Sequence, residues 1–331
     1  MNLSSQHHRL FGSWRCRFRP GEGSCVWLHY CCGWLLSGLL FGPRRPGCWQ
    51  SNNPCRGPIL RTDFGGKLHA HGGVFLVMSS MIALSKLCKA FSGKVILRDL
   101  DLEIEKGHSL VVIGGSGTGK SVLLKCIMNL IHPDSGTVLV GGEDVTNIAI
   151  HRRQGPKFGM LFQGGALFDS LKVWENISFS LMQGRGLTRS DAHEHAIKKL
   201  QDVGLSPDVA DLYPVELSGG MQKRVGLARA ISDDPDIIFF DEPTTGLDPI
   251  MSDVINRLIR DCVDRLGATA VTITHDMASA QHIGDDIAML QHGQIIWRGP
   301  ASDVRHSGNA YVDQFVHGRA EGPITIPGGR K

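Results

Sequence analysis

The chain has 331 residues, of which 42% are hydrophobic and 20% are charged, and its formal net charge at pH 7 is +3. This length allows one large domain or two modest ones, with a buried core. Residues 1–80 carry nine Lys and Arg against two acidic residues, whereas the remainder carries 26 basic and 30 acidic residues. The basic excess therefore belongs to the first 80 residues, and the main domain has no charge signature of nucleic-acid binding.

Residues 1–77 differ in composition from the rest of the chain, and we interpret them as an N-terminal extension. The first 80 residues contain six of the nine cysteines and four of the six tryptophans. Their apolar segment, residues 26–41, is shorter than the roughly 20 residues that a membrane-spanning helix requires. Beyond residue 80 no apolar run approaches that length. We therefore expect the main domain to be soluble and cytoplasmic.

Several interpretations of this extension compete. Its charge and apolarity fit a signal peptide or a short membrane anchor. Its cysteines fit a metal or disulfide site, although they lack a paired C-x-x-C spacing. A disordered extension, or a start assigned upstream of the native one at Met78 or Met81, accounts for the lack of helical or strand periodicity. We favour a misassigned start.

A strand pattern begins at Ile82, and residues 109–113 (SLVVI) form the short β-branched run of a buried parallel strand. The later cysteines lie in apolar stretches, which predicts small core residues in a reducing compartment; they are Cys88, Cys126 and Cys262.

A phosphate-binding loop follows this strand, because the next eight residues match G-x-x-x-x-G-K-[ST]. Glycines allow successive backbone N–H groups to surround phosphate oxygens, and the helix expected over residues 121–131 directs its positive end at the same anion. We expect Lys120 to reach the β- and γ-phosphates and the Ser121 hydroxyl to bind Mg²⁺. A Gly-rich turn without a ligand would not require the full pattern. The loop consists of Gly114, Gly115, Ser116, Gly117, Thr118, Gly119, Lys120 and Ser121.

Two carboxylates follow a second buried strand, residues 237–240. In α/β sheets, ligands bind at the carboxyl ends of the strands. Asp241 is suited to hold Mg²⁺, and Glu242 to orient or activate the attacking water as a general base. A strand that ends in a solvated acidic turn is the alternative, which the phosphate loop makes less favourable.

Between these motifs lies Leu-Ser-Gly-Gly-Met-Gln-Lys-Arg, residues 217–224. Ser218 is expected to cap a helix over residues 221–231, and Gly219 and Gly220 allow a ligand to approach its N-terminus. The segment resembles the signature motif of ABC ATPases, usually Leu-Ser-Gly-Gly-Gln, with Met221 in place of the first Gln. An ordinary capped helix is the alternative.

Further motifs of this family occur in the expected order. Phe162 and Gln163 resemble the Q-loop, residues 246–248 with Asp248 the D-loop, and His275 the switch histidine. The resemblance implies that Gln163 contributes to catalysis and to Mg²⁺ binding. Phe91 occupies the position where an aromatic ring stacks on adenine, although a single Phe is more often a core residue.

The resemblance covers roughly residues 82–305 and implies an α/β fold with a RecA-like core, an antiparallel β subdomain and a helical subdomain. Segments 82–113 and 136–141 would supply strands to the antiparallel subdomain and the adenine side. The domains would be the ATPase domain at 78–305, with its helical subdomain at about 164–232, and a tail at 306–331. The family implies ATP and Mg²⁺ as cofactors. It also implies a head-to-tail homodimer in which the phosphate loop of one subunit and Ser218–Gly220 of the other enclose each ATP.

Residues 175–232 are expected to be helical, and two stripes at helical spacing are interpreted as core. The histidines at positions 193 and 195 are expected to be solvated. The first stripe consists of Ala192, Ala196, Leu200 and Val203, and the second of Val254, Leu258, Cys262 and Leu266.

The substrate must be inferred from weaker marks: residues 162–169, Met221, residues 241–250 and the segment 311–323. Together these resemble the ATPases of Mla/Mce-type phospholipid transport systems, which serve outer-membrane lipid asymmetry. This resemblance implies a membrane permease, an MCE-domain lipid-binding protein and a STAS-domain partner, with no nucleic acid. The ATPase would lie at the cytoplasmic face of the inner membrane. An importer for a polar solute is the alternative within the class.

Other classes fit less well. ABC ATPases of translation usually carry two cassettes on one chain, and those of DNA repair split the cassette with a coiled coil, whereas this chain has one set of motifs and no heptad insertion. A switch that binds ATP without hydrolysing it is disfavoured by Glu242 and His275. Residues after Gln163 are expected to lie beside a groove for the permease, with some of Leu167, Phe168 and Trp174 exposed for that purpose.

Overall fold

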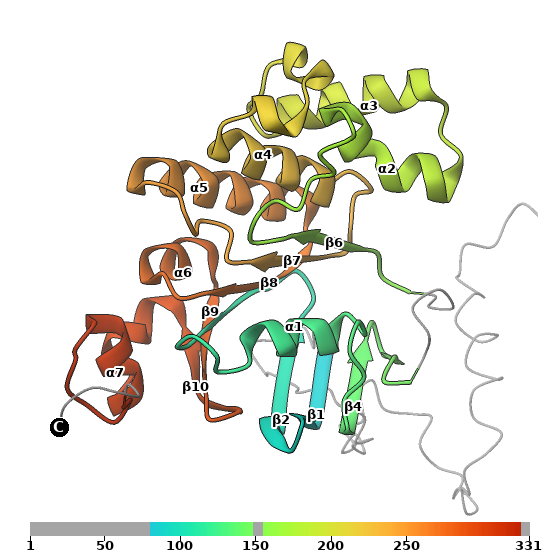
Figure 1. Cartoon of the computed structure of the whole chain (residues 1–331). Coiled ribbons are helices and arrows are strands. Elements are labelled where there is room, and N and C mark those ends of the chain that lie inside the picture. Colours follow the sequence, from blue (N-terminus) through green and yellow to red (C-terminus); the bar gives the residue numbers. More distant parts are fainter. Residues whose placement is uncertain (1–79, 148–154, 326–331) are drawn as a thin grey trace, which may run out of the picture. The chain divides into compact units, whose positions relative to one another are not determined.

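The computed structural model describes residues 80–147 and 155–325 (Figure 1). These residues belong to one compact unit. The N-terminal extension, with its apolar segment and six cysteines, lies outside the described residues, so its interpretations stay predictions. Within the described ranges, no helix combines the length and apolarity that a membrane span needs.

The first sheet is antiparallel and has the order β2-β1-β4-β5. Strand β1 pairs with both β2 and β4, so that Ile82 lies opposite Ile104 on one side and Val140 on the other. These apolar residues are fully buried, as the strand pattern from Ile82 predicts. The strands are β1 (Ser80–Phe91), β2 (Lys94–Glu105), β4 (Ser135–Val140) and β5 (Glu143–Asp144).

The second sheet has the order β10-β9-β3-β8-β7-β6, and all its neighbours are parallel except β9 and β10. Strand β3 belongs to this sheet, so the assignment of the whole segment 82–113 to the antiparallel subdomain was wrong at its end. All five residues of β3 are buried, which suits a central strand. The strands are β3 (Ser109–Ile113), β6 (Phe158–Leu161), β7 (Ile237–Asp241), β8 (Thr269–Thr274), β9 (Asp286–Gln291) and β10 (Gln294–Pro300).

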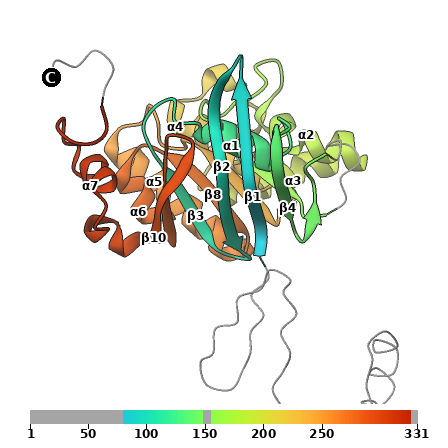
Figure 2. The same cartoon turned by 90° about the horizontal axis from the view of Figure 1, so that it is seen from below.

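The parallel sheet separates two hydrophobic cores, because successive side chains point to opposite faces. Val111 and Ile113 of β3 pack with the helices that lie above the sheet in Figure 1. Leu110 and Val112 pack on the other face, with α1 (Lys120–Ile127) and the antiparallel sheet. Figure 2 shows that antiparallel sheet in front of α1. The loops at the carboxyl ends of the parallel strands therefore lie on a sheet that is supported from both sides.

Helix α1 ends before the predicted residue 131. Asn129 adopts a left-handed conformation with φ 58°. The backbone N–H of Leu130 donates to Lys125 O and that of Asn129 to Cys126 O. These are the two hydrogen bonds of a Schellman motif, which ends the helix.

The segment 175–232 contains three helices separated by 3₁₀ turns and loops, rather than continuous helix. Helix α3 buries the predicted stripe of Ala192, Ala196, Leu200 and Val203. His195 is half-buried and bonds to Ser232 O at 2.8 Å, so its prediction as a solvated residue was wrong. The elements are α2 (Val173–Arg185), α3 (Arg189–Asp202), η3 (Pro207–Asp211), η4 (Pro214–Glu216) and α4 (Gly219–Ala230).

The stripe predicted on α5 (Pro249–Leu266) was right in part, because Cys262 is buried and Leu258 and Leu266 pack half-buried against the same core. Val254 and Leu258 are half-buried, whereas Ile255 and Ile259 are fully buried. Both sets have helical spacing, and packing against β-strand residues selects the second. The remaining elements are α6 (Met277–Ile283), η5 (Ala301–His306) and α7 (Ala310–His317).

Two of the three later cysteines are core residues, as predicted. Cys126 and Cys262 are 1% exposed. Burial raises the pKa of the Cys126 thiol to about 11, which keeps it protonated and unreactive. Cys88 is half-buried, and its sulfur accepts the backbone N–H of Asp99 at 3.2 Å, so the prediction of a core residue was wrong there.

Candidate functional site

The phosphate loop joins β3 to α1, and its backbone requires glycine where the helix begins. Gly119 has φ 107°, and a Cβ atom there would lie 2.9 Å from Ile96 Cγ2. The hydroxyl of Thr118 donates to Gly115 O at 2.9 Å, which holds the loop in a tight turn. Ser116 and Gly117 at the tip are exposed. The loop thus presents the N-terminus of α1 to solvent at the carboxyl end of a central strand, where an anion is stabilised.

Lys120 is buried although it carries a charge. Its Nζ donates to the carbonyl oxygens of Gly114 at 2.7 Å and Gly115 at 2.9 Å. Burial lowers the pKa of Lys120, and the negative charges of Glu242 and Asp241 oppose that effect. An ammonium group can form charge-assisted hydrogen bonds with phosphate oxygens. Lys120 therefore lies buried against the loop carbonyls, and its contact with the β- and γ-phosphates stays a prediction.

The two carboxylates lie at the end of β7. Asp241 is half-buried, and its pKa is raised first by burial and second by the neighbouring charge of Glu242. Glu242 has φ 46°, a left-handed conformation that is uncommon for a non-glycine residue. Its backbone N–H donates to Ile273 O on β8 at 2.9 Å. Strain held in this way often occurs at functional sites.

The structure brings the three predicted catalytic residues together around Glu242. One carboxylate oxygen, Oε2, accepts a hydrogen bond from Gln163 Nε2 at 3.2 Å. The other oxygen, Oε1, lies 3.3 Å from Nδ1 of His275. Thr245, which the sequence did not single out, donates from its hydroxyl to Oε2 at 2.9 Å. Each of these partners comes from a different loop, so the carboxylate is oriented from several sides.

Lys223 is a further residue of this site that the sequence reasoning missed. It lies on α4, it is 6% exposed, and its Nζ donates to the carbonyl oxygen of Gln163. The same Nζ lies 3.5 Å from the carbonyl oxygen of Glu242. The sequence offered one sign of this role, a lysine in a helix close to the apolar residues Val225 and Leu227. That pattern is too common to identify a site.

Ser218 caps α4 as predicted, and its hydroxyl accepts the backbone N–H of Met221 at 3.3 Å. The helix begins at Gly219, two residues earlier than expected. Ser218 and Gly219 are exposed, whereas Gly220 is buried against Met251. Among the described residues, no hydrogen bond or ion pair joins this motif to the phosphate loop. The structure of one chain therefore does not bring these two predicted nucleotide-binding elements together.

Asp248 caps α5. Its Oδ1 accepts the backbone N–H groups of Ile250 and Met251, both at 3.0 Å. Asp248 is itself exposed, so its carboxylate is available to a ligand or a second subunit as well.

The capping role of Asp248 can be tested by substitution. Asp248→Ala should lower the free energy of unfolding by about 1 kcal/mol, because two N–H groups lose their acceptor. Asp248→Ser should retain most of that stability, since serine is also a good cap. Chemical denaturation of both variants measures the difference. Equal losses in the two variants would contradict the assignment of a cap.

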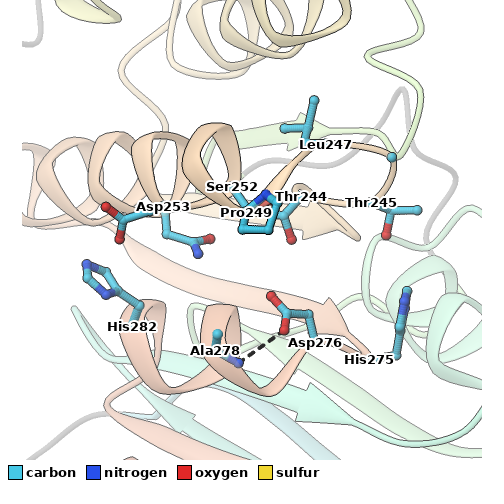
Figure 3. A pocket seen from close by; sticks show the side chains of 12 residues that line it. Thr244, Thr245, Leu247, Pro249, Ser252, Asp253, His275, Asp276, Ala278 and His282 are labelled. Carbon is cyan, nitrogen blue, oxygen red and sulfur yellow. Dashed lines mark hydrogen bonds between the residues drawn. The ribbon is translucent and has the colours of Figure 1, made fainter.

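A cavity of about 410 Å³ lies between the residues before α5 and the loop that leads to α6. Figure 3 shows His275 and Thr245 at one end of it and Asp253 and His282 at the other. Asn256 also lines the cavity; it donates to Ser279 Oγ at 3.0 Å, and its Oδ1 is buried without a partner among the described residues. The Ser279 hydroxyl also bonds to Thr244, so a buried network connects the loop after β7 and helix α5 to helix α6.

Phe91 stands apart from the residues around Glu242. It ends β1 and is 43% exposed, and Lys89 Nζ lies 5.3 Å from the centre of its ring. An exposed ring beside a cation is available for stacking on a planar ligand. Its role in binding adenine stays a prediction.

The residues present fit a magnesium ion. Mg²⁺ usually takes one or two protein oxygen ligands and completes its shell with water and phosphate oxygens. The exposed Ser121 hydroxyl and the Asp241 carboxylate supply such ligands. Burial and, second, the charge of Glu242 raise the pKa of Asp241, and a bound cation would oppose both effects. A site built from three or more His, Cys, Asp or Glu side chains is absent from the described residues, so a purely protein-made metal site is not formed there.

Comparison with known proteins agrees with this arrangement. Residues 97–245 match the family model described as "ABC transporter". The probable ribonucleotide transport ATP-binding protein mkl of Mycobacterium leprae is 38% identical over 249 residues, which cover 75% of this chain and 72% of that protein. The chain belongs to the ABC transporter family. It is therefore an ABC ATPase, and its enzymatic activity is ATP hydrolysis.

Two further comparisons refine the picture of this ABC ATPase. The intermembrane phospholipid transport system ATP-binding protein MlaF of Haemophilus influenzae is 35% identical over 247 residues, covering 74% of this chain and 93% of that protein. The dimeric ATP-binding cassette MJ0796, in a post-hydrolysis state bound to ADP and Pi, matches with a TM-score of 0.62 and 29% identity. That match covers 67% of this chain and 99% of the other. The predicted cassette fold, with its parallel and antiparallel sheets, is thus confirmed.

Proposed function

We propose that this ABC ATPase powers phospholipid transport, as a subunit bound to a permease at the cytoplasmic face of the inner membrane. The observation that carries the proposal is the match to MlaF, which spans 93% of that protein. Met221 in the signature motif and the segments 162–169 and 311–323 support it, because they resemble Mla/Mce-type ATPases. An MCE-domain lipid-binding protein and a STAS-domain protein would complete the complex.

The proposed mechanism assigns a role to each group around the phosphate loop. Lys120 and the loop N–H groups bind the triphosphate and stabilise the charge that develops on it. Ser121, Asp241 and Gln163 would hold Mg²⁺, which when bound neutralises phosphate charge. Glu242 accepts a proton from the attacking water.

The partners of Glu242 set its orientation. Gln163 and Thr245 donate to Oε2, which leaves Oε1 for water and for His275, 3.3 Å away. His275, whose side chain is 54% exposed, can contact the terminal phosphate as ATP arrives. The geometry therefore favours Oε1 as the atom that accepts the proton.

A second copy of the chain would complete each nucleotide site. Ser218 and Gly219 expose a helix N-terminus that has no phosphate to bind in its own subunit. The MJ0796 cassette, which this chain resembles, forms dimers. We infer a head-to-tail homodimer in which this N-terminus and Asp248 face the partner's nucleotide.

The proposed permease surface consists of three exposed aromatic residues, Phe162, Phe168 and Phe179. Phe168 and Phe179 contact each other with ring centroids 5.1 Å apart, and Arg229 lies over the Phe162 ring at 6.0 Å. Trp174 is only 6% exposed, and so belongs to the core rather than to this surface. Exposed aromatic groups of this kind favour contact with another protein.

Phe168→Asp tests this surface. The side chain is 47% exposed, so the variant should lose less than about 1 kcal/mol of stability and bind ATP normally, yet fail to copurify with the permease. Leu130→Asp, at an exposed position after α1, is the control and should still copurify. Retention of the permease by the Phe168 variant would place the docking surface elsewhere.

Copurification from native membranes also tests the substrate. Phospholipid transport predicts that an MCE-domain protein accompanies the tagged ATPase and permease. The second candidate function, import of a polar solute, is favoured by the similarity to the protein named for ribonucleotide transport. It predicts a periplasmic solute-binding protein in place of the MCE-domain protein.

A further inference from the structure

Lys223 connects the signature helix to two catalytic residues. It is the third residue after Gly220, near the start of α4, and its Nζ lies between the carbonyl oxygens of Gln163 and Glu242. These two residues follow β6 and β7, and the Gln163 side chain donates to the Glu242 carboxylate. Of the cations that the structure describes, Lys223 is the one that contacts the backbone of both.

Burial of the Lys223 ammonium group costs free energy unless hydrogen bonds and opposite charges compensate for the lost hydration. The side chain is 6% exposed, and burial lowers the pKa of Lys223, while the charges of Asp241 and Glu242 oppose that effect. A buried ammonium group loses several kcal/mol of hydration unless hydrogen bonds replace it. Here the backbone carbonyls and the nearby carboxylates replace the lost hydration. The ammonium group of Lys223 thereby connects α4 to the loops that contain Gln163 and Glu242.

Anchoring of the Q-loop on α4 does not by itself require Lys223. Arg229, two turns further along the same helix, donates to the carbonyl oxygens of Gly165 and Ala166, both at 2.7 Å. Gly226 allows close packing, since a Cβ there would lie 2.8 Å from Leu161 Cδ1. The loop is therefore held against α4 without Lys223, and the contact that Lys223 adds is the one that reaches Glu242.

We propose that Lys223 is a positioning residue that sets Gln163 and Glu242 relative to each other according to the position of the signature helix. A shift of α4 along the sheet would move the ammonium group and, with it, the two carbonyl groups. The carboxylate of Glu242 would then reach its catalytic position only when α4 is correctly seated. The proposal rests on the assignment of Glu242 as the general base.

The test compares Lys223→Met, Lys223→Arg and a control, Lys198→Met, in the full chain. Methionine keeps the length of the side chain and removes its charge and donors. A displacement of about 1 Å at a catalytic group costs on the order of 100-fold in rate, so we expect kcat for ATP to fall between about tenfold and 100-fold. The Kd for ATP and the melting temperature should change little. Arginine should restore most of kcat.

The Lys198 side chain is 67% exposed on α3 and pairs with Glu194, so its methionine variant should keep the native kcat. A kcat within about twofold of native in Lys223→Met overturns the proposal, whether or not the Kd for ATP rises. If that variant melts below the assay temperature, Lys223→Gln is measured by the same criteria. Native activity in Glu242→Gln, assayed alongside, would instead reject the base assignment, so the two failures are distinguishable.

Discussion

Glu242→Gln should bind ATP with native affinity and hydrolyse it at least about 100-fold more slowly, because general-base catalysis contributes about 10²- to 10⁴-fold. Glutamine has nearly the same shape and keeps an oxygen that accepts hydrogen bonds from Gln163 and Thr245, but it does not take a proton from water. Steady-state ATPase assays and nucleotide titration measure the two quantities separately. In the proposed dimer, the variant should accumulate the ATP-bound closed form, which size-exclusion chromatography would detect.

The control for this variant is Glu194→Gln. The Glu194 side chain is 71% exposed on α3 and pairs with Lys198 four residues away, so its loss should leave kcat unchanged. A Glu242→Gln enzyme that works near the native rate would reject Glu242 as the base. The positive φ of Glu242 provides a second check, since a glycine there would relieve backbone strain while removing the carboxylate. Glu242→Gly should therefore be inactive, and the change in backbone conformation at this position should not lower the free energy of unfolding.

Lys120→Met should weaken ATP binding by about tenfold to 100-fold, which corresponds to the loss of a charge-assisted hydrogen bond worth about 1.5 to 3 kcal/mol. The ammonium group is buried against the carbonyl oxygens of Gly114 and Gly115, and methionine cannot supply its positive charge. Titration with a fluorescent ATP analogue measures the affinity. Because burial lowers the pKa of Lys120, removing its charge should not lower the melting temperature.

Lys106→Met provides the matched control, since Lys106 is exposed in the turn before β3. It should bind ATP as the native chain does. An unchanged Kd in Lys120→Met, beside a folded protein, would contradict the phosphate-loop assignment.

Several features of the site could be predicted because they are local in the chain. The phosphate loop lies within eight consecutive residues, and the pair Asp241 and Glu242 directly follows a run of four apolar residues. Glycine conformations, helix capping by Ser218 and strand burial depend mostly on near neighbours. These predictions needed no knowledge of which segments meet in space.

Other features depend on packing between distant segments. In β7, Ile238 and Phe240 face one core while Ile237 and Phe239 face the other, although all four residues are equally apolar. On α5, two stripes with the same helical spacing were available, and the sheet selected the one through Ile255. Periodicity shows that a face is buried, but contact with a neighbouring element decides which face.

The sequence by itself determined the class of chemistry, because the groups that bind phosphate and attack it occur in contiguous motifs with restricted residue types. Only the tertiary structure decided how these groups are held. Lys223 and Gln163 are 60 residues apart, and His275 approaches Glu242 from the loop that follows a different strand, β8. Such contacts arise from the order of strands in the sheet and the seating of α4 against it, which local residue preferences do not encode.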